Sequence, residues 1–271
     1  MGEMSDLLGL PLLASEHGGK VDQVMILFHI LMAAVFIGWG AFFVYTLIRF
    51  RKKKNPTANY HGVRSHSSTY IEVAFIICEI ILLVGFAIPF WAVEVNALPA
   101  PESNPVEVRV VAQQYVWNFH YPGTDGIFGK TSPDRVDEQT NAIGLHKDDP
   151  NAKDDITTNW LYLPVNRTAL LRLSSKDVIH GFALPEFRVK QDVLPGMSIP
   201  VSFIPTVTTE EMRKMHGDDA REYEIACAQL CGLGHARMRG YLSILTQEAY
   251  DAWLIENAPK EGDAGDDFWD L

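Results

Sequence analysis

Charge is missing from two long stretches of this sequence. Residues 24–48 contain no Asp, Glu, Lys or Arg, and residues 73–93 contain one such residue, Glu79. A helix of about 20 residues rises roughly 30 Å, which is the thickness of the hydrocarbon core of a bilayer. A buried helix of a soluble protein rarely stays uncharged on every face over that length. The sequence therefore predicts a membrane protein with two transmembrane helices, at about residues 22–49 and 70–94.

Acidic residues are absent between the two spans, where residues 49–64 carry six Lys or Arg side chains. Short loops rich in Lys and Arg stay on the cytoplasmic side of the cell membrane. We therefore expect the basic loop in the cytoplasm, and the N-terminus and everything after residue 95 on the outer side. The N-terminal flank is acidic and the first apolar run is longer than a signal-peptide core, so we interpret it as a retained span, with trimming of the first 20 residues as an open alternative. We expect no nucleic-acid partner for this chain of net charge -11.

Cysteine is scarce, with three residues in the chain, and none stands in a Cys-x-x-Cys-His motif. That absence excludes a covalently attached haem c in this chain. An odd number of cysteines in an exported chain also leaves one thiol over after any pairing. Cys78 lies inside the second apolar stretch, where a small buried thiol is the default interpretation.

The other two cysteines lie in the segment that is richest in metal ligands. From Cys227 to Met238 the chain holds two thiols, the imidazole of His235 and a thioether, all ligands for a soft metal. A blue-copper loop offers one Cys, one His and a distant Met to a single copper, but here a second Cys stands four residues earlier. Two thiolates on one loop can bridge two copper ions, each of which then needs its own nitrogen ligand. His180 is the candidate for the second nitrogen.

The two motifs, Asp177–Pro185 and Cys227–Met238, resemble the dinuclear copper A site of cytochrome c oxidase subunit II. By that resemblance the two cysteines bridge the coppers, the two histidines are terminal ligands, and a thioether and one backbone carbonyl are weak axial ligands. The implied copper ligands are His180, Cys227, Gln229 through its carbonyl, Cys231, His235 and Met238.

Three other interpretations of the loop compete. Two Cys and two His could hold structural zinc, but zinc has no use for Met238, and Cys-x2-Cys is the commoner spacing. A disulfide between Cys227 and Cys231 is possible outside the cytoplasm, but it leaves both histidines unexplained. A plain buried loop is the third alternative.

Residues 99–246 are expected to form an all-β sandwich, and the resemblance specifies a cupredoxin-like domain after a two-helix transmembrane hairpin at 21–98. Period-two alternation and Pro, Gly and Asn punctuation mark the candidate strands. An Asp-rich solvated insertion at 123–158 interrupts them. We further expect a loosely ordered outer segment at 1–20 and an acidic tail at 247–271 that begins as a helix over Glu248–Ile255. The candidate strands are Val106–Val110, Thr168–Leu173, Ser198–Ile204, Arg221–Ala226 and Gly240–Leu245.

The segment Gln114–Tyr121 resembles the aromatic segment through which electrons enter this family. Relatives carry Trp at the position of Tyr115, so the resemblance implies entry at Tyr115, with Trp117 two residues on; alternating aromatics also suit a strand core. Tyr in place of Trp leaves the donor open, and a membrane-bound or permanently associated c-type cytochrome is an alternative to a mobile one. Relatives carry Glu at Gln229, where its carboxylate reaches magnesium; an amide oxygen binds Mg²⁺ less firmly.

Glu72 and Glu79 are seven residues apart and therefore lie on about the same face of the second helix. A carboxyl within hydrocarbon costs several kcal/mol unless it meets protein or water. We therefore predict that another polypeptide covers this face. The resemblance places Glu72 at the entry of a proton pathway in subunit I, while an interfacial acid at a helix start is the alternative.

The resemblance implies a subunit of a haem–copper terminal oxidase, a proton-translocating oxidoreductase with subunit I and other membrane subunits as partners. Electrons would pass from a c-type cytochrome through copper A to haem in subunit I, where oxygen is reduced. Two other functions remain as alternatives: a quinol-oxidase subunit II, which lacks copper ligands, and a copper-delivery or structural-zinc module.

Overall fold

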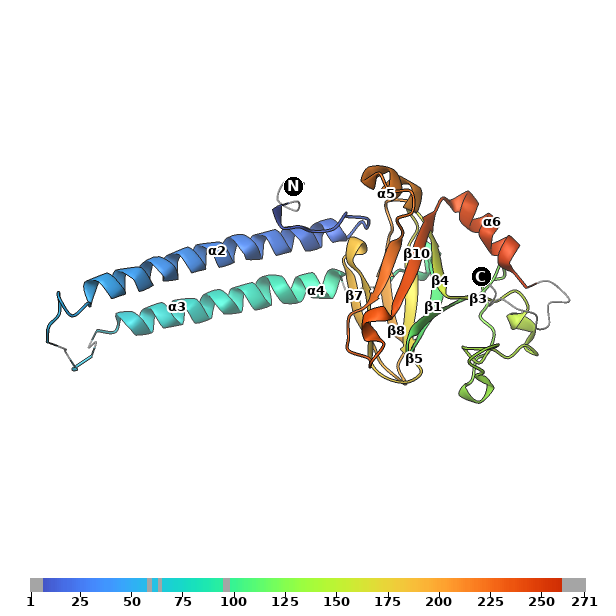
Figure 1. The fold of residues 1–271 in the computed structure, drawn as a ribbon, viewed down its shortest axis with the longest axis horizontal. Coiled ribbons are helices and arrows are strands. Elements are labelled where there is room, and N and C mark those ends of the chain that lie inside the picture. Colours follow the sequence, from blue (N-terminus) through green and yellow to red (C-terminus); the bar gives the residue numbers. More distant parts are fainter. Residues whose placement is uncertain (1–6, 58–59, 63–64, 95–97, 260–271) are drawn as a thin grey trace. The chain divides into compact units, whose positions relative to one another are not determined.

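A computed structural model describes residues 7–57, 60–62, 65–94 and 98–259. The chain folds as two compact units, one made of long helices and one made of β-strands (Figure 1). The parts of the expected outer segment and acidic tail that fall at residues 1–6 and 260–271 lie outside the described residues.

The helical unit contains α2 (Gly18–Arg49) and a second helical run. That run comprises α3 (Ser67–Leu82), a π-helical turn (Leu83–Ala87) and α4 (Ile88–Glu94). Both are long and apolar enough to cross a membrane, and neither has a buried stripe that would belong to a soluble core. The two predicted helices are thus present, each beginning a few residues earlier than the apolar pattern indicated.

Residues 11–19 belong to the β unit, and here the expectation of a loosely ordered segment is wrong. The amide of Ala14 donates to the carbonyl of Glu186 at 2.8 Å, and its carbonyl accepts from the amide of Thr206 at 2.9 Å. The hydroxyl of Ser15 donates to the carbonyl of Phe187 at 2.7 Å. Both Ala14 and Ser15 are buried. These hydrogen bonds to distant residues order the segment. The segment is too short to show a periodic pattern, so the sequence does not indicate that order.

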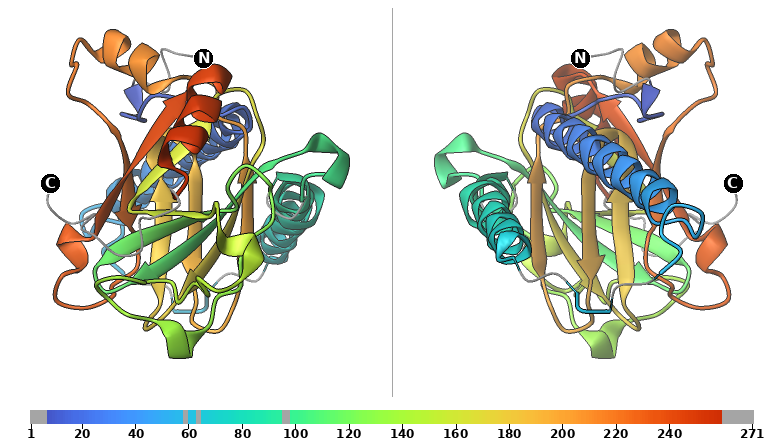
Figure 2. Two further views of the ribbon diagram at one scale, coloured as in Figure 1. Left: turned by 90° about the vertical axis from the view of Figure 1, so that its right-hand side faces the viewer. Right: turned by 90° about the vertical axis from the view of Figure 1, so that its left-hand side faces the viewer.

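The β unit is a sandwich of two five-stranded sheets, with strand orders β3-β2-β1-β5-β8 and β4-β10-β9-β6-β7 (Figure 2). The strands are β1 (Val106–Gln113), β2 (Val116–Tyr121), β3 (Ile156–Thr158), β4 (Trp160–Pro164), β5 (Ala169–Ser175), β6 (His180–Leu184), β7 (Val189–Val193), β8 (Ile199–Phe203), β9 (Tyr223–Cys227) and β10 (Arg239–Leu245).

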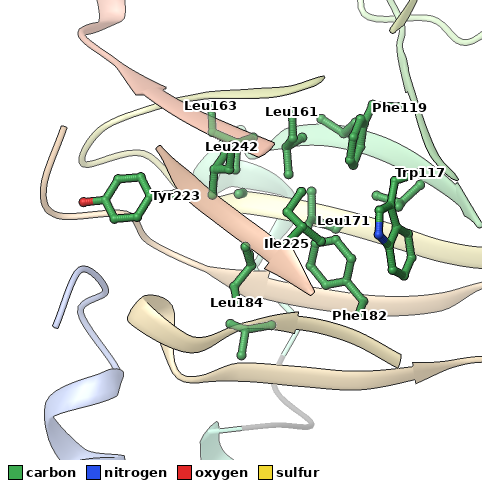
Figure 3. Packing of buried hydrophobic residues seen from close by; sticks show 14 of the residues in the cluster. Trp117, Phe119, Leu161, Leu163, Leu171, Phe182, Leu184, Tyr223, Ile225 and Leu242 are labelled. Carbon is green, nitrogen blue, oxygen red and sulfur yellow. The ribbon is translucent and has the colours of Figure 1, made fainter. Parts of the chain in front are cut away.

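The core lies between the two sheets (Figure 3). Along β1 every second residue is buried, beginning with Val106, as a strand with one covered face requires. Aromatic rings fill the centre: the ring of Trp117 packs edge-on against Phe182, with centroids 5.4 Å apart. Each large side chain buried in this way contributes about 1.5–3 kcal/mol, so the core holds the two sheets together.

All five predicted strands are present, as β1, β5, β8, β9 and β10. Five strands were not predicted: β2, β3, β4, β6 and β7. In β6 every residue is buried, so that strand shows no polar alternation. The aromatic residues of β2 do alternate with polar ones, but every residue after its first is buried. Strand β3 has three residues.

Two short helices complete the unit. Thr208 and Glu211 form a reciprocal capping box at the start of α5 (Thr209–His216). Helix α6 (Gln247–Asn257) confirms the expected helical start of the tail. The insertion is a set of turns with two 3-10 helices, Pro133–Arg135 and Pro150–Ala152. It ends before the expected residue 158, because Ile156–Thr158 pair with β2 as strand β3.

Candidate metal centre

The predicted ligand loop connects two neighbouring strands. Strands β9 and β10 pair antiparallel, with Ala226 opposite Arg239, so the chain between Cys227 and Met238 must turn at one end of the sheet. Strand β6 lies on the other side of β9 and places Phe182 opposite Cys227. His180 opens β6 and therefore reaches the same end of the sheet. Sheet topology thus brings together two motifs that are far apart in sequence.

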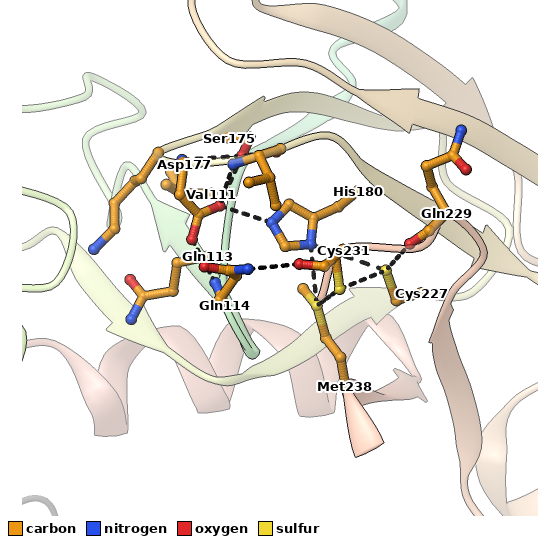
Figure 4. Close-up of polar contacts among 12 residues, drawn as sticks. Val111, Gln113, Gln114, Ser175, Asp177, His180, Cys227, Gln229, Cys231 and Met238 are labelled. Atoms are coloured by element: carbon orange, nitrogen blue, oxygen red, sulfur yellow. Dashed lines mark hydrogen bonds and ion pairs between the residues drawn. The ribbon is translucent and has the colours of Figure 1, made fainter. Parts of the chain in front are cut away.

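Four sulfur and nitrogen side chains converge at this end (Figure 4). The two thiol sulfurs of Cys227 and Cys231 are 3.7 Å apart. The Nδ1 atom of His180 is 3.9 Å from Sγ of Cys227 and 3.1 Å from Sδ of Met238. Ligand atoms of His180 and the two cysteines all lie within 4.8 Å of one another.

His235 and Gln229 border the same cluster. The Nδ1 atom of His235 is 3.7 Å from Sγ of Cys231, and the carbonyl oxygen of Gln229 is 3.2 Å from Sγ of Cys227. His235 opens a single 3-10 turn, His235–Arg237, which directs its ring back toward the thiols. The structure therefore brings together every residue that the sequence nominated as a copper ligand.

A carboxylate fixes the orientation of His180. Nε2 of His180 lies 2.8 Å from Oδ1 of Asp177, so Nδ1 is the nitrogen that faces the sulfurs. The other oxygen of Asp177 accepts from the backbone amide of Gln114 at 2.7 Å. Burial acts to raise the pKa of Asp177, but its hydrogen bonds to His180 and to the amides of Gln114 and Val178 leave that pKa below the ordinary value. A carboxylate behind a histidine sets the tautomer of a metal ligand.

Gln114 is the residue at this site whose contacts sequence reasoning missed. Its side-chain amide donates to the carbonyl of Cys231 at 2.6 Å, so it connects the end of β1 to the ligand loop. No local pattern indicates this contact, and only the position of Gln114 next to Tyr115 points to the segment.

The site fits a soft metal on two observations. First, its donor set combines two sulfurs with imidazole nitrogens and a thioether, which are ligands that suit copper. Second, β6 packs directly on the ligand loop: a Cβ on Gly181 would lie 2.8 Å from the amide nitrogen of Gln229. Burial and the neighbouring thiol of Cys227 raise the pKa of Cys231 to about 11, so a metal must displace its proton.

The two aromatic candidates differ in exposure. Trp117 is fully buried and meets the ring of His180 edge-on, with centroids 6.1 Å apart, so it belongs to the core. Tyr115 is 39% exposed and its ring covers the ligand loop, since a Cβ on Gly234 would meet that ring at 2.5 Å. Within the described residues, Tyr115 is thus the ring of this segment that touches both solvent and the loop.

Glu72 and Gln229 are exposed in the isolated chain. Glu72 and Glu79 both lie in α3. Because they are seven residues apart, about two helical turns, both carboxyls lie on about one face of the helix.

Comparison with known proteins decides the family. The family model described as the periplasmic domain of cytochrome c oxidase subunit II matches residues 106–244. The chain belongs to the cytochrome c oxidase subunit II family. This membership and the two apolar helices indicate a membrane protein whose β unit lies on the outer side of the membrane.

Several members of the subunit II family are similar over most of the chain. The alternative cytochrome c oxidase subunit 2 of Bradyrhizobium diazoefficiens is 29% identical over 249 residues, covering 91% of this chain and 83% of the relative. Cytochrome c oxidase subunit 2 of Cereibacter sphaeroides is 28% identical over 238 residues, covering 83% and 72%. The solved periplasmic domain of subunit II of the Bradyrhizobium japonicum oxidase aligns with 22% identity over 56% of this chain and 92% of its own, at a TM-score of 0.38.

Proposed function

We propose that this subunit II is the electron-entry subunit of a haem–copper terminal oxidase and holds a dinuclear copper A centre. The observation that carries the proposal is the pair of thiols 3.7 Å apart, flanked by one imidazole on each side. That spacing allows both sulfurs to contact the same two metal ions. A single-copper site or a zinc site has no need for this combination with a buried thioether.

Each ligand would have a distinct role. Cys227 and Cys231 would bridge the two metal ions, while His180 and His235 would each complete one of them. Met238 and the carbonyl of Gln229 would bind weakly along the remaining directions. When bound, the copper pair supplies one-electron redox chemistry with its charge shared between two metals and two sulfurs. The chain's own contribution is rigidity, because ligands held on strands move little when charge arrives.

The surface around the ligand loop suits a protein partner. Leu230 and Leu233 are 78% and 103% exposed, and both belong to the loop that carries the thiols. Large apolar side chains exposed together mark an interaction site. We infer that electrons arrive here from a c-type cytochrome, mobile or membrane-bound, with the ring of Tyr115 as the entry group. Trp117, buried behind His180, would act as packing for that ligand.

The two apolar helices suggest how the chain is oriented in the membrane and how it joins the oxidase. The hairpin would sit in the cell membrane with the basic loop in the cytoplasm and both the N-terminus and the copper domain outside. Subunit I would receive electrons for oxygen reduction coupled to proton pumping. Glu72 would border its proton-pathway entry, and the amide oxygen of Gln229 could reach a magnesium ion at the subunit I border.

Metal analysis together with near-infrared absorption tests the proposal. The full-length chain, purified in detergent and loaded with copper, should bind two copper ions and show an absorption band from paired copper. Cys231→Ser should remove that band, because one bridge is lost, whereas Cys78→Ser should leave both copper content and band intact. Zinc, or one copper per chain, would support the structural-zinc or copper-delivery alternative instead.

A further inference from the structure

A cavity of about 400 Å³ opens on the outer face of the sheet β3-β2-β1-β5-β8, apart from the metal ligands. Its floor is formed by side chains of three neighbouring strands, and the 123–158 insertion supplies its roof. Three positively charged side chains line it, together with two serines and apolar groups. The lining residues that matter below are Arg109, Phe128, Lys130, Arg172, Ser174 and Ser198.

The strand register places like charges side by side in this floor. Arg109 on β1 is the direct partner of His120 on β2 and of Arg172 on β5. Residues paired across strands point to the same face of a sheet. The two guanidinium groups are therefore neighbours, and like charges directly opposite one another are destabilising. Such a pair needs negative charge nearby.

His120, Arg109 and Arg172 form a row across the three strands. The two outer residues, His120 and Arg172, have carboxylate partners, and the central Arg109 does not. Nε2 of His120 is 2.6 Å from Oδ2 of buried Asp155, and Arg172 forms an ion pair with Glu107. Half-buried Arg109 lies between them. It contacts a backbone carbonyl at the limit of hydrogen bonding, 3.4 Å, and among the described residues no carboxylate lies within 4 Å of it.

Aromatic and electrostatic contacts hold Arg109 in this position. Its guanidinium carbon stands 4.1 Å from the centre of the Phe128 ring, a stacking contact that fixes the plane of the fork. Burial lowers the pKa of Arg109, against the attraction of Asp155 and Glu107, and the charge of Arg172 lowers it further. An arginine stays charged in proteins regardless. Removing a cation even partly from water without pairing it with an anion costs free energy.

We propose that this cavity binds a small organic anion through its phosphate or carboxylate oxygens. Arg109 and Arg172 present planar forks that match such oxygens, Ser174 and Ser198 add hydroxyl donors, and exposed Lys130 stands at the rim. Phe128 supplies an apolar wall for the carbon part of the ligand. The volume is within the range of small-molecule sites.

Calorimetric titration of the full-length, copper-loaded chain in detergent tests the site, with glycerol 3-phosphate in one arm and succinate in the other. Saturable binding of one anion per chain is expected in at least one arm, and the arm that binds identifies phosphate or carboxylate chemistry. Arg109→Gln should weaken it about tenfold or more, because a charge-assisted contact is lost. Lys147→Gln, an exposed charge change in the same insertion, should leave the affinity unchanged.

A second variant separates a built site from general attraction to positive charge. Ser198 is exposed at the cavity, so Ser198→Trp can fill the cavity while leaving every charge and the core in place. It should abolish binding while the thermal midpoint of the chain stays that of the wild type. Absence of saturable binding in both arms would overturn the proposal. So would equal weakening by Lys147→Gln, or full binding by Ser198→Trp.

Discussion

Gly181 shows how a single hydrogen atom in place of a methyl group can position the loop that is proposed to hold copper. Its missing side chain lets β6 approach the ligand loop so closely that a Cβ would lie 2.8 Å from the nitrogen of Gln229 and 2.9 Å from the carbonyl carbon of Ala228. Both atoms are backbone and cannot turn aside as a side chain can. The amide of Ala228 also donates to the carbonyl of Gly181 at 2.8 Å, which ties the loop to this strand.

Gly181→Ala should therefore displace the ligand loop. We expect fewer than two coppers per chain, a shifted near-infrared band, and a loss of about 1–3 kcal/mol in the free energy of unfolding from overpacking. Copper analysis and chemical denaturation measure these effects. Gly19→Ala is the control, since its Cβ would meet Leu13 at an ordinary 3.8 Å. Wild-type copper content in Gly181→Ala would show that this contact does not position the ligands.

Tyr115 is predicted to carry electrons because of its place between solvent and the ligand loop. Tyr115→Phe keeps the ring and should leave the reduction rate by a c-type cytochrome nearly unchanged. Tyr115→Leu removes the ring and should slow stopped-flow reduction about tenfold, equivalent to about 1.4 kcal/mol in the barrier. Tyr241→Leu is a matched control, because Tyr241 is equally exposed at 39%. Equal slowing in both leucine variants would assign the effect to general surface change.

The residues proposed as copper ligands could be selected from the sequence because cysteine, histidine and methionine side chains stand there at a distinctive spacing. The contacts that position them could not. Asp177 is sequence-close to His180, so its orienting role could be expected, and the 2.8 Å contact agrees. The bond from Gln114 to the loop and the close approach at Gly181 depend on which strands become neighbours, which local sequence does not specify.

The 123–158 insertion shows how a polar element without a core of its own can be ordered. Its aspartates accept hydrogen bonds from backbone amides: Asp149 from Lys130 at 2.9 Å, and Asp137 from Thr140 at 2.8 Å. The hydrogen bond from the amide of Thr140 is the largest cause that lowers the pKa of Asp137, and the bond from the amide of Lys130 is the largest for Asp149. Both pKa values therefore lie below the ordinary 3.8. A carboxylate with a lowered pKa stabilises the fold above its unfolded pKa.

Lowering the pH from 5 to below 3.8 should therefore loosen the insertion, since the stabilisation is lost as pH falls through the folded pKa values. Hydrogen exchange over residues 129–150, corrected for the intrinsic effect of pH, should show faster opening at the lower pH. In Asp149→Asn the insertion should show this faster opening already at pH 5. Asp148→Asn should not, because its ion pair with Arg135 is exposed and such pairs contribute little. Opening that is independent of pH would contradict this account.

Elements differ in how much of them the sequence reveals. Strand β1 buries one face and alternates buried with partly exposed residues, so its period of two is visible in the sequence. Strand β6 is buried on both faces, and residues 11–19 are ordered by partners more than 150 residues away. In both cases long-range packing decides the conformation, and no local pattern reports it.

At the scale of the whole molecule, the helical unit is incomplete when alone. Glu79 lies in the middle of an otherwise uncharged apolar run and is exposed in the isolated chain, as is Glu72. A carboxyl in hydrocarbon is costly unless protein or water meets it, and the two helices of this chain leave that face uncovered. We therefore expect a hydrogen-bond donor of another subunit to meet Glu79 in the assembled oxidase.

Glu79→Leu should then weaken assembly, because it leaves that donor buried without a partner, at a cost of about 1–3 kcal/mol, or roughly 5- to 150-fold in the association constant. Glu79→Gln keeps an acceptor oxygen and should assemble nearly as the wild type does. Ile81→Leu, just over half a turn away on the helix, is the matched control. Co-purification with subunit I under increasing detergent measures the effect. If Glu79→Leu remains bound as firmly as Ile81→Leu, the carboxyl faces lipid or water rather than a partner, and the carboxyl face of α3 is not a subunit interface.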